Sequence, residues 1–308
     1  MHKGQNLKGD PMALPLHEIA ALGTATCWAT TGLISADAVR ALGAFHFNLL
    51  RQLFVTVILA AIVLGAGLWS GMDWATVGIL VVSGVVGILV GDTFNFAAVG
   101  RLGPRRTGAI FALNAPMAAL MGWAFLDEAL PLQAVLGIGI AVAGVALAIL
   151  GRPRANAHRF EMVQGTFLVG VGFALAAGLG QAAGSLIARP VMTAGLDPYL
   201  ASLIRVGASG LAMGLLAGLP FAPPRPVAFP PKVLLLIAAT GVIGLLLGMT
   251  LFLFALQGGQ TGIIATLSAT SPVIILPLLW LRTGQRPSAK SWLGAGLAVA
   301  GLALIFTR

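Results

Sequence analysis

The chain carries too few charged residues to be a soluble protein. Asp, Glu, Lys and Arg together make up 9% of its 308 residues, whereas 58% of the residues are hydrophobic. A typical soluble domain is about 25% charged, because charged groups keep its surface in water. Since this chain lacks them, we expect it to be embedded in a lipid bilayer.

Cysteine and metal-binding patterns are also scarce. The single cysteine, Cys27, lies in an apolar run, which excludes a disulfide framework and a cysteine-based zinc site. The four histidines are scattered without metal-ligand spacing, and no phosphate-binding loop of the GxxxxGK type is present. We therefore expect no metal, no cofactor and no direct drive by ATP.

The net charge of +9 does not indicate a nucleic-acid partner. Basic residues that bind nucleic acid gather in a stripe or patch, whereas here they lie between the apolar runs, where Lys and Arg direct helix insertion. The first apolar run follows Lys3, Lys8 and two prolines and has no small-residue cleavage site. It therefore indicates a retained helix rather than a signal peptide.

Apolar runs of membrane-spanning length follow one another along the whole chain. A spanning helix needs about 20 mainly apolar residues, whereas the strands of a β-barrel show about 10 residues of alternating polarity. Ten segments fit the helix: 17–35, 45–69, 75–99, 107–126, 132–150, 163–187, 199–219, 232–256, 261–281 and 289–306. The sequence therefore predicts an all-α, multi-pass protein of the cell (inner) membrane with ten transmembrane helices.

The two halves of the chain resemble each other. Residues 136–147 lie over residues 293–304 with nine of twelve positions identical, at an offset of 157. Further pairs follow in the same order at nearly this offset: Arg51/Arg205, Gly91/Gly248, Thr93/Thr250, Thr107-Gly108/Thr261-Gly262, Pro116/Pro272 and Pro131/Pro287. We expect a tail (1–16), a first repeat (17–150), a basic linker (151–162) and a second repeat (163–308).

An odd number of helices in each repeat has a consequence for orientation. After five helices the second repeat enters the membrane from the opposite side, so the two halves are inverted with respect to each other. Inverted repeats are a recurrent way to build alternating access around a site near the middle of the membrane.

The segment from Ala112 to Pro131, followed by a Gly/Ala-rich helix, resembles the EamA-type proteins of the drug/metabolite transporter superfamily. Pro116, Glu128 and Pro131 fall on the positions of the family pattern. The second half matches through Pro272, Pro287 and residues 294–301, and has Gly284 where an acidic residue often recurs. The resemblance implies a ten-helix exporter or exchanger of small metabolites, with a central cavity between the halves.

Three charged residues stand out well inside the predicted helices, and two of them are expected to pair. Arg51 lies near the start of the second helix and Asp92 near the end of the third. Because consecutive helices run antiparallel, both residues lie about 10 Å from the same surface, at 1.5 Å per residue. Charges inside a membrane are costly unless paired, so we expect an ion pair. The alternative is that Asp92 carries protons during transport.

The third charge, Arg205, is offered no acid by the equivalent helix of its own half, because Met249 stands near the position of Asp92. It could bind a carboxylate or phosphate of the substrate, or extend to the lipid headgroups. Other polar residues lie on the helices that the family uses for its cavity. The expected substrate pathway consists of Trp28, Thr31, Asn95, Asn114, Gln181, Arg205 and Ser268. The alternative for each is a hydrogen bond between helices, worth about 0.6 kcal/mol.

Small residues predict close helix contacts. The pairs Gly139/Ala143 and Gly296/Ala300, each four residues apart, are expected to let helices approach each other closely. The sequence leaves open whether a similar face joins two copies into a homodimer.

The sequence thus predicts a secondary transporter of small metabolites, such as amino acids or drug-like compounds, and not an enzyme. One alternative is a membrane scaffold subunit without transport activity. The other is an intramembrane serine hydrolase at Ser209, whose Gly-Ala-Ser-Gly context resembles that of rhomboid proteases, but a histidine base in reach of the serine is missing.

The loop charges predict the orientation of the termini. Ten helices place both termini on one face, with four Lys and Arg, whereas twelve lie on the other face. Basic residues favour the cytoplasmic side, so we expect the termini to face away from the cytoplasm. The resemblance implies the opposite, since members of the family usually keep both termini inside.

Overall fold

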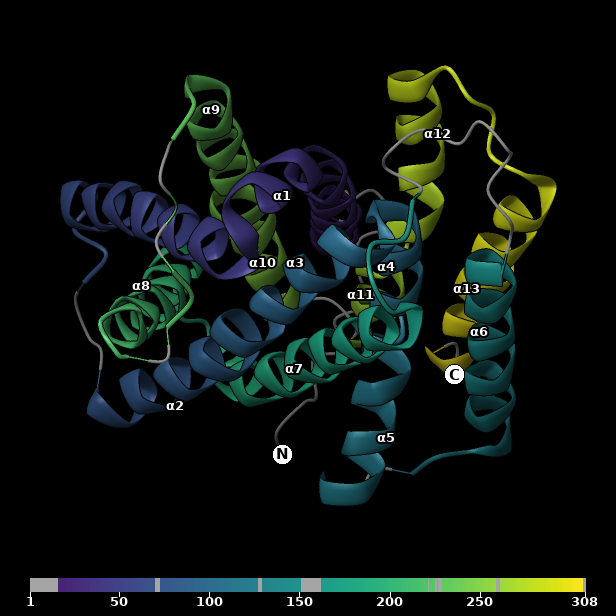
Figure 1. The fold of residues 1–308 in the computed structure, drawn as a ribbon. Helices are drawn as coiled ribbons and strands as arrows, with labels where there is room; N and C mark the ends of the chain where they lie inside the picture. Colours follow the sequence, from purple (N-terminus) through teal and green to yellow (C-terminus); the bar gives the residue numbers. More distant parts are fainter. Residues whose placement is uncertain are drawn as a thin grey trace, which may run out of the picture.

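The computed structural model describes residues 16–69, 73–126, 129–150, 162–220, 222–224, 226, 229–258 and 261–306. These residues are mostly helical, as Figure 1 shows. All but the last residue of the tail, Glu128, and all but the last residue of the linker lie outside the described residues.

The first element, α1, is a 50-residue helix from Leu16 to Gly65. A straight helix of this length would measure about 75 Å, more than twice the hydrocarbon thickness of about 30 Å. At Gly43 the backbone adopts φ 75° and ψ 157°, which glycine reaches without the steric cost of a Cβ. The break divides α1 into two parts, each of membrane-spanning length. The loop expected between residues 35 and 45 is helical up to this point.

The remaining elements are α-helices of different lengths and two π-helical segments, η1 and η3. The first half continues with α2 (Trp74–Gly84), η1 (Val85–Val90), α3 (Gly91–Leu102), α4 (Pro104–Phe111), α5 (Asn114–Leu126) and α6 (Leu132–Leu150). The second half contains α7 (Phe167–Thr193), α8 (Pro198–Ala217), α9 (Pro231–Thr240), η3 (Gly241–Met249), α10 (Thr250–Gly258), α11 (Thr261–Ser268), α12 (Ser271–Thr283) and α13 (Ala289–Phe306).

Two aspartates explain where two of these helices begin. The carboxylate of Asp73 accepts the backbone N–H of Thr76 at the start of α2. The carboxylate of Asp197 accepts those of Tyr199 and Leu200 at the start of α8, and Pro198 follows as the first helical residue. Such side chains satisfy backbone donors that have no partner within the helix.

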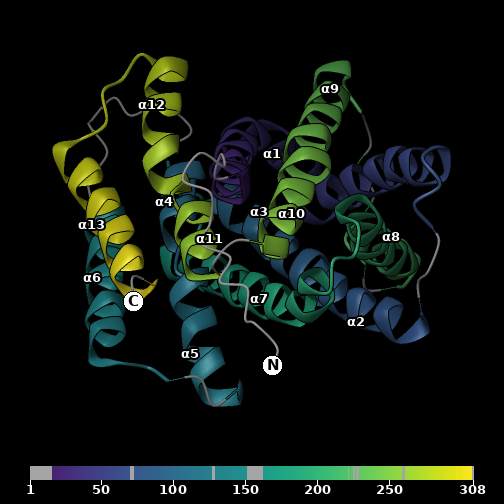
Figure 2. The same cartoon turned by 180° about the vertical axis from the view of Figure 1, so that it is seen from behind.

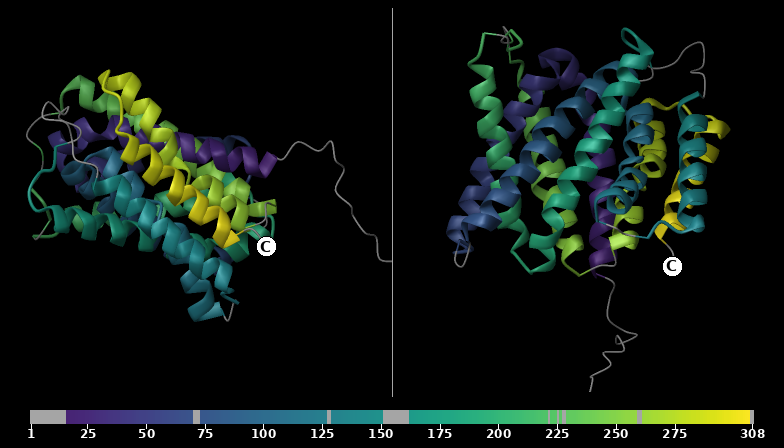
Figure 3. Two further views of the ribbon diagram at one scale, coloured as in Figure 1. Left: turned by 90° about the vertical axis from the view of Figure 1, so that its right-hand side faces the viewer. Right: turned by 90° about the horizontal axis from the view of Figure 1, so that it is seen from below.

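The described residues form an all-helical membrane protein with about eight to ten apolar spans. Eight helices are long and apolar enough to cross a membrane, with α1 counted once, and Ala289–Ile305 is a shorter apolar helix. Treating the two parts of α1 as separate spans brings the total to ten, and that number stays a prediction. The beginning of α1 and the end of α13 lie on the same side of the molecule (Figure 3).

The two halves carry the same irregularities at the same places. The π-helical turns of η1 in the first half correspond to those of η3 in the second. The break between α4 and α5, at residues 112–113, corresponds to the break between α11 and α12, at residues 269–270. The offset is again 157. π-helical turns and broken membrane helices are both concentrated at functional sites.

Helices α6 and α13 stand together at one end of the molecule (Figures 1 and 2). A Cβ atom added at Gly137 would lie 2.7 Å from the carbonyl oxygen of Gly301, and one at Gly144 would lie 2.7 Å from that of Gly294. The backbones therefore touch, which only glycine allows. Because Gly137 corresponds to Gly294 and Gly144 to Gly301, the contact pairs one repeat with the other.

The small pairs predicted for this contact are wrong. Gly139 and Gly296 meet nothing within 4 Å, and both lie with Ala143 and Ala300 on the exposed sides of α6 and α13. The contact uses Gly137, Ala141 and Gly144 and their counterparts, which fall on the other side of the same helices. Both sides have a small-residue pattern, so the sequence alone could not decide between them.

Substituting one glycine on each side of α6 tests this packing. Gly144→Ala is expected to lower the stability of the protein by roughly 1–3 kcal/mol, because its Cβ would press against the backbone of α13. Gly139→Ala is the matched control and should leave stability unchanged or slightly higher. Melting temperatures of the two purified variants in detergent measure the difference. Equal melting temperatures would contradict the backbone contact.

Candidate substrate pathway

Two cavities lie between the helices of the bundle. The first, which we call the Asp92 cavity, has a volume of about 60 Å³, and the second, the Asn114 cavity, about 70 Å³. Each is large enough for several water molecules. Both are lined by residues from both repeats, so they lie where the halves meet.

The predicted pathway residues divide between these cavities. Trp28, Thr31, Asn95 and Gln181 line the Asp92 cavity, together with Arg51 and Asp92. Asn114 and Ser268 line the Asn114 cavity, which also contains Ser185 and Arg189. Arg205 lines neither of them, although it is close to the first. The structure thus gathers all but one of these residues around two adjoining spaces.

Trp28 is shared by the walls of both cavities. Its ring contacts Phe111, in the wall of the Asp92 cavity, edge to face at 6.3 Å, and Phe252, in the wall of the Asn114 cavity, at 5.3 Å. The three rings form an aromatic layer between the cavities. A Cβ at Gly248 would come within 3.1 Å of the Trp28 ring, so this glycine makes room for the tryptophan.

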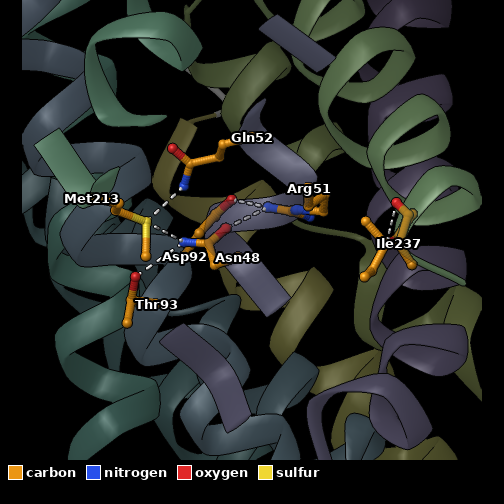
Figure 4. Close-up of polar contacts among 8 residues, drawn as sticks. Asn48, Arg51, Gln52, Asp92, Thr93, Met213 and Ile237 are labelled. Carbon is orange, nitrogen blue, oxygen red and sulfur yellow. Dashed lines mark hydrogen bonds and ion pairs between the residues drawn. The ribbon is translucent and has the colours of Figure 1, made fainter. Parts of the chain in front are cut away.

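Arg51 and Asp92 form an ion pair in which the guanidinium Nη2 contacts the carboxylate Oδ2 (Figure 4). The two side chains are 3% and 17% exposed. The same Nη2 donates to Asn48 Oδ1 at 3.2 Å, and the guanidinium carbon lies 4.4 Å from the centre of the Phe96 ring. The ion pair predicted from the equal depth of Arg51 and Asp92 in the membrane is therefore confirmed. Their role in transport stays a prediction.

Two amide side chains of α1, those of Asn48 and Gln52, extend the hydrogen-bond network around this pair. The Nδ2 of Asn48 donates to Thr93 Oγ1 at 3.0 Å and to Met213 Sδ at 3.7 Å. Gln52 Nε2 donates to the same sulfur at 3.4 Å, as Figure 4 shows. The pair is thus held in a polar network that joins α1 to α3 and α8, and such networks fix the orientation of their members.

Arg205 is fully buried, with 0% of its surface exposed. The guanidinium therefore stays inside the protein, and the alternative that it extends to lipid headgroups is wrong. Its Nη1 donates to Met249 Sδ at 3.4 Å. Its Nε and Nη2 have no hydrogen-bond partner within the described part of the chain.

Several hydroxyl groups at the cavities also lack partners. Thr31 Oγ1 and Thr107 Oγ1, at the Asp92 cavity, and Ser268 Oγ, at the Asn114 cavity, are buried and make no hydrogen bond to any described residue. Buried polar atoms are normally satisfied. These hydroxyls are therefore available to a ligand or to water in the cavities.

Thr107 lines the Asp92 cavity but was not among the predicted pathway residues. It lies in α4 and is 1% exposed. The signal that could have found it was its place in the Thr-Gly pair that recurs at residues 261–262. Phe111 and Phe252, which flank Trp28, were also missed, because an aromatic residue in an apolar run has no distinctive pattern.

The breaks in the helices lie beside the cavities. Between α4 and α5, Asn114 Nδ2 donates to the carbonyl of Phe111 at 2.7 Å. Next to the break between α11 and α12, Ser271 Oγ donates to the carbonyl of Ser268, the last residue of α11, at 3.4 Å and to the carbonyl of Ala25 in α1 at 3.1 Å. Side chains thus satisfy backbone groups where the helices are interrupted. In membranes, interrupted backbone occurs where it lines a cavity or is buried in protein.

The chain belongs to the EamA-like transporter family. The sequence model of this family matches twice, over residues 16–150 and over residues 168–307. The duplicated helix breaks and the arginines of both halves agree with two copies of one domain. Proteins of this family are typically transporters rather than enzymes.

Solved structures support the fold. One of them, titled only "Crystal structure of protein", aligns with a TM-score of 0.68 and 20% identity, over 94% of this chain and 95% of its own. At this identity the likeness shows a shared fold alone. A comparison with curated proteins gives no match.

The pairing of Arg51 and Asp92 can be tested by a double-mutant comparison. Arg51→Met alone should destabilise the protein by roughly 3–5 kcal/mol, because it leaves a buried carboxylate without its partner. Arg51→Met combined with Asp92→Leu should recover most of the lost stability, since both charges are then removed. The melting temperatures of the purified single and double variants measure these differences in stability. If the double variant is less stable than either single variant, the pair is not a buried, mutually dependent ion pair.

Proposed function

We propose that the chain is a secondary transporter of small metabolites, such as amino acids or drug-like compounds, and that it works by alternating access. The observation that carries this proposal is the pair of cavities on either side of Trp28, each of which has polar side chains in its wall. A transporter must keep its pathway closed at one point while a substrate occupies it. The aromatic layer is suited to this task because it separates the two spaces with side chains alone.

The repeat supports the same mechanism. Inverted halves can exchange their conformations, so that a cavity open to one side becomes a cavity open to the other. The Asp92 cavity is bounded by residues near Gly103, where the chain turns from α3 to α4. The Asn114 cavity is bounded by α5 and by Arg189 near the end of α7. We propose that rocking of the halves opens each cavity in turn and that Trp28 moves between them.

Unpartnered hydroxyls provide the means to hold a substrate. Each buried polar group without a partner costs about 1–3 kcal/mol. A substrate that bonds to Thr31 and Thr107 in the Asp92 cavity, or to Ser268 in the Asn114 cavity, would recover this energy. Asn95, Asn114 and Gln181 add amide groups that can both donate and accept. We propose that these side chains bind the polar part of the substrate.

Asp92 is the group proposed to couple transport to an ion. Its carboxylate contacts Arg51 and also forms part of the cavity wall. A proton or a cationic group that enters the cavity would compete with Arg51 for the carboxylate. Such competition would make the arrangement of α1 and α3 depend on what occupies the cavity.

The two alternatives have less support. A scaffold subunit has no use for unpartnered polar groups around interior cavities. A serine hydrolase needs a base on Ser209, but Ser209 Oγ is buried and makes no hydrogen bond to any residue that the structure describes.

Replacing Trp28 tests the proposal. Proteoliposomes containing the protein are offered a panel of radiolabelled amino acids, with unlabelled compound inside to drive exchange. The wild-type protein should exchange at least one of them. Trp28→Ala should join the two cavities and convert exchange into leak, so that accumulated label falls severalfold. The reason is that Trp28 stands at the centre of the aromatic layer and contacts both of the other rings.

Trp123→Ala is the matched control, because Trp123 is 55% exposed on α5 and contributes to neither cavity. It should behave as the wild type. Undiminished accumulation by Trp28→Ala would exclude the tryptophan as the barrier. No flux of any compound tested, while the protein is folded in the vesicles, would favour the scaffold alternative.

A further inference from the structure

The side chains around Arg205 repeat those around Arg51. In the first half, Asn48 and Arg51 of α1 contact Thr93 and Asp92 of α3. In the second half, Ser202 Oγ of α8 lies 3.2 Å from Thr250 Oγ1, and Arg205 donates to Met249. Residues of α8 are offset by 154 from those of α1, and Thr250 and Met249 by 157 from their counterparts. The same site is therefore built twice.

The two sites differ in one acceptor. Arg51 faces a carboxylate, whereas Arg205 faces the thioether sulfur of Met249, which is a weak acceptor. A buried cation without a strong acceptor is costly. The second site thus has the cation and the geometry of an ion pair but lacks the anion.

The guanidinium of Arg205 lies between Gly87 and Met249. On one side Gly87 packs directly against it, because a Cβ there would come within 3.2 Å of Arg205 Nη2. On the other side stands Met249, which also forms part of the wall of the Asp92 cavity. Methionine is unbranched and adapts its shape easily. Movement of this one side chain would connect Arg205 with the cavity.

The charges determine which ligand suits the site. Arg205 and Asp92 lie close enough to interact electrostatically, and Asp92 is already paired with Arg51. The three groups together carry a net charge of +1, which a single negative charge balances. The other buried arginines, Arg105 and Arg106, donate to the carbonyls of Ala148 and Ile149 at the end of α6. A monoanion therefore fits this site better than a doubly charged phosphate ester.

We propose that Arg205 binds the carboxylate of a small monoanionic substrate, which displaces Met249 Sδ and supplies the acceptor that Asp92 provides in the first half. Arginine and carboxylate can form two parallel hydrogen bonds, and Nε and Nη2 are the donors that have no partner. This assignment rests on the proposed transport function and narrows its substrates to compounds that carry a carboxylate.

Matched pairs of a carboxylate and its amide test the assignment. Lactate with lactamide, and benzoate with benzamide, have nearly the same shape and differ in charge. Binding to the purified protein in detergent is measured by calorimetry and by the shift in melting temperature. At least one acid should bind roughly 10- to 100-fold more tightly than its amide, the range expected for a hydrogen-bonded charge.

Two variants locate the effect. Arg205→Met should abolish the preference for the acid. Met249→Asp should abolish the preference too, because the new carboxylate would pair with Arg205 as Asp92 pairs with Arg51. If Arg205→Met does not fold, the binding measured with Met249→Asp tests the assignment alone. Met162→Asp is the matched control, since Met162 is 59% exposed and lines neither the Asp92 cavity nor the Asn114 cavity. It should keep the preference.

Equal binding of acid and amide, or a preference that persists in Met249→Asp, would overturn the assignment. Stabilisation by inorganic phosphate but by none of the carboxylates would overturn it as well. Each of these results is compatible with transport of amino acids or other compounds in proteoliposomes. Absence of all flux there would instead contradict the proposed function, so the two failures can be told apart.

Discussion

A charge inside a membrane must find a partner within the protein, and this constraint organises the centre of the molecule. Arg51 and Arg205 are buried among the helices, and an isolated charge there is costly. Arg51 meets the constraint through Asp92, Asn48 and the Phe96 ring. These contacts tie the second part of α1 to α3. Among the residues that the structure describes, Arg205 has only the sulfur of Met249 as an acceptor. The acceptor is therefore the difference between two sites that are otherwise alike.

The repeat explains how the cavities arise. A continuous helix satisfies its own backbone and leaves no room between closely packed neighbours. Here α4 and α5, and α11 and α12, are interrupted at matching positions, and side chains such as Asn114 and Ser271 bond to carbonyls near the breaks. The glycines of α6 and α13 hold the fifth helices of both halves together at one end. The cavities lie beside the breaks, away from that rigid pair.

The sequence predicted the fold class, the family and the two halves, because length, hydropathy and repetition are properties of the chain alone. The contact of Arg51 with Asp92 followed from helix geometry, since depth can be counted in residues. Three features could not be obtained in this way. The side of α6 that meets α13 depends on which of two small-residue patterns is buried. The place of Trp28 between two cavities depends on packing against Phe111 and Phe252. The burial of Arg205 depends on Gly87 and Met249, which lie on other helices.

The central claim is that the Asp92 and Asn114 cavities open in turn, to opposite sides of the membrane, with Trp28 between them. Single cysteines at Thr107, for the Asp92 cavity, and at Asn114, for the Asn114 cavity, in a Cys27→Ala background report on this directly. A membrane-impermeant thiol reagent is applied from one face at a time. The account predicts that Thr107→Cys reacts from the face where α3 turns into α4 and Asn114→Cys from the face of the termini. Reaction of both cysteines from the same face only would contradict two cavities that open to opposite sides of the membrane.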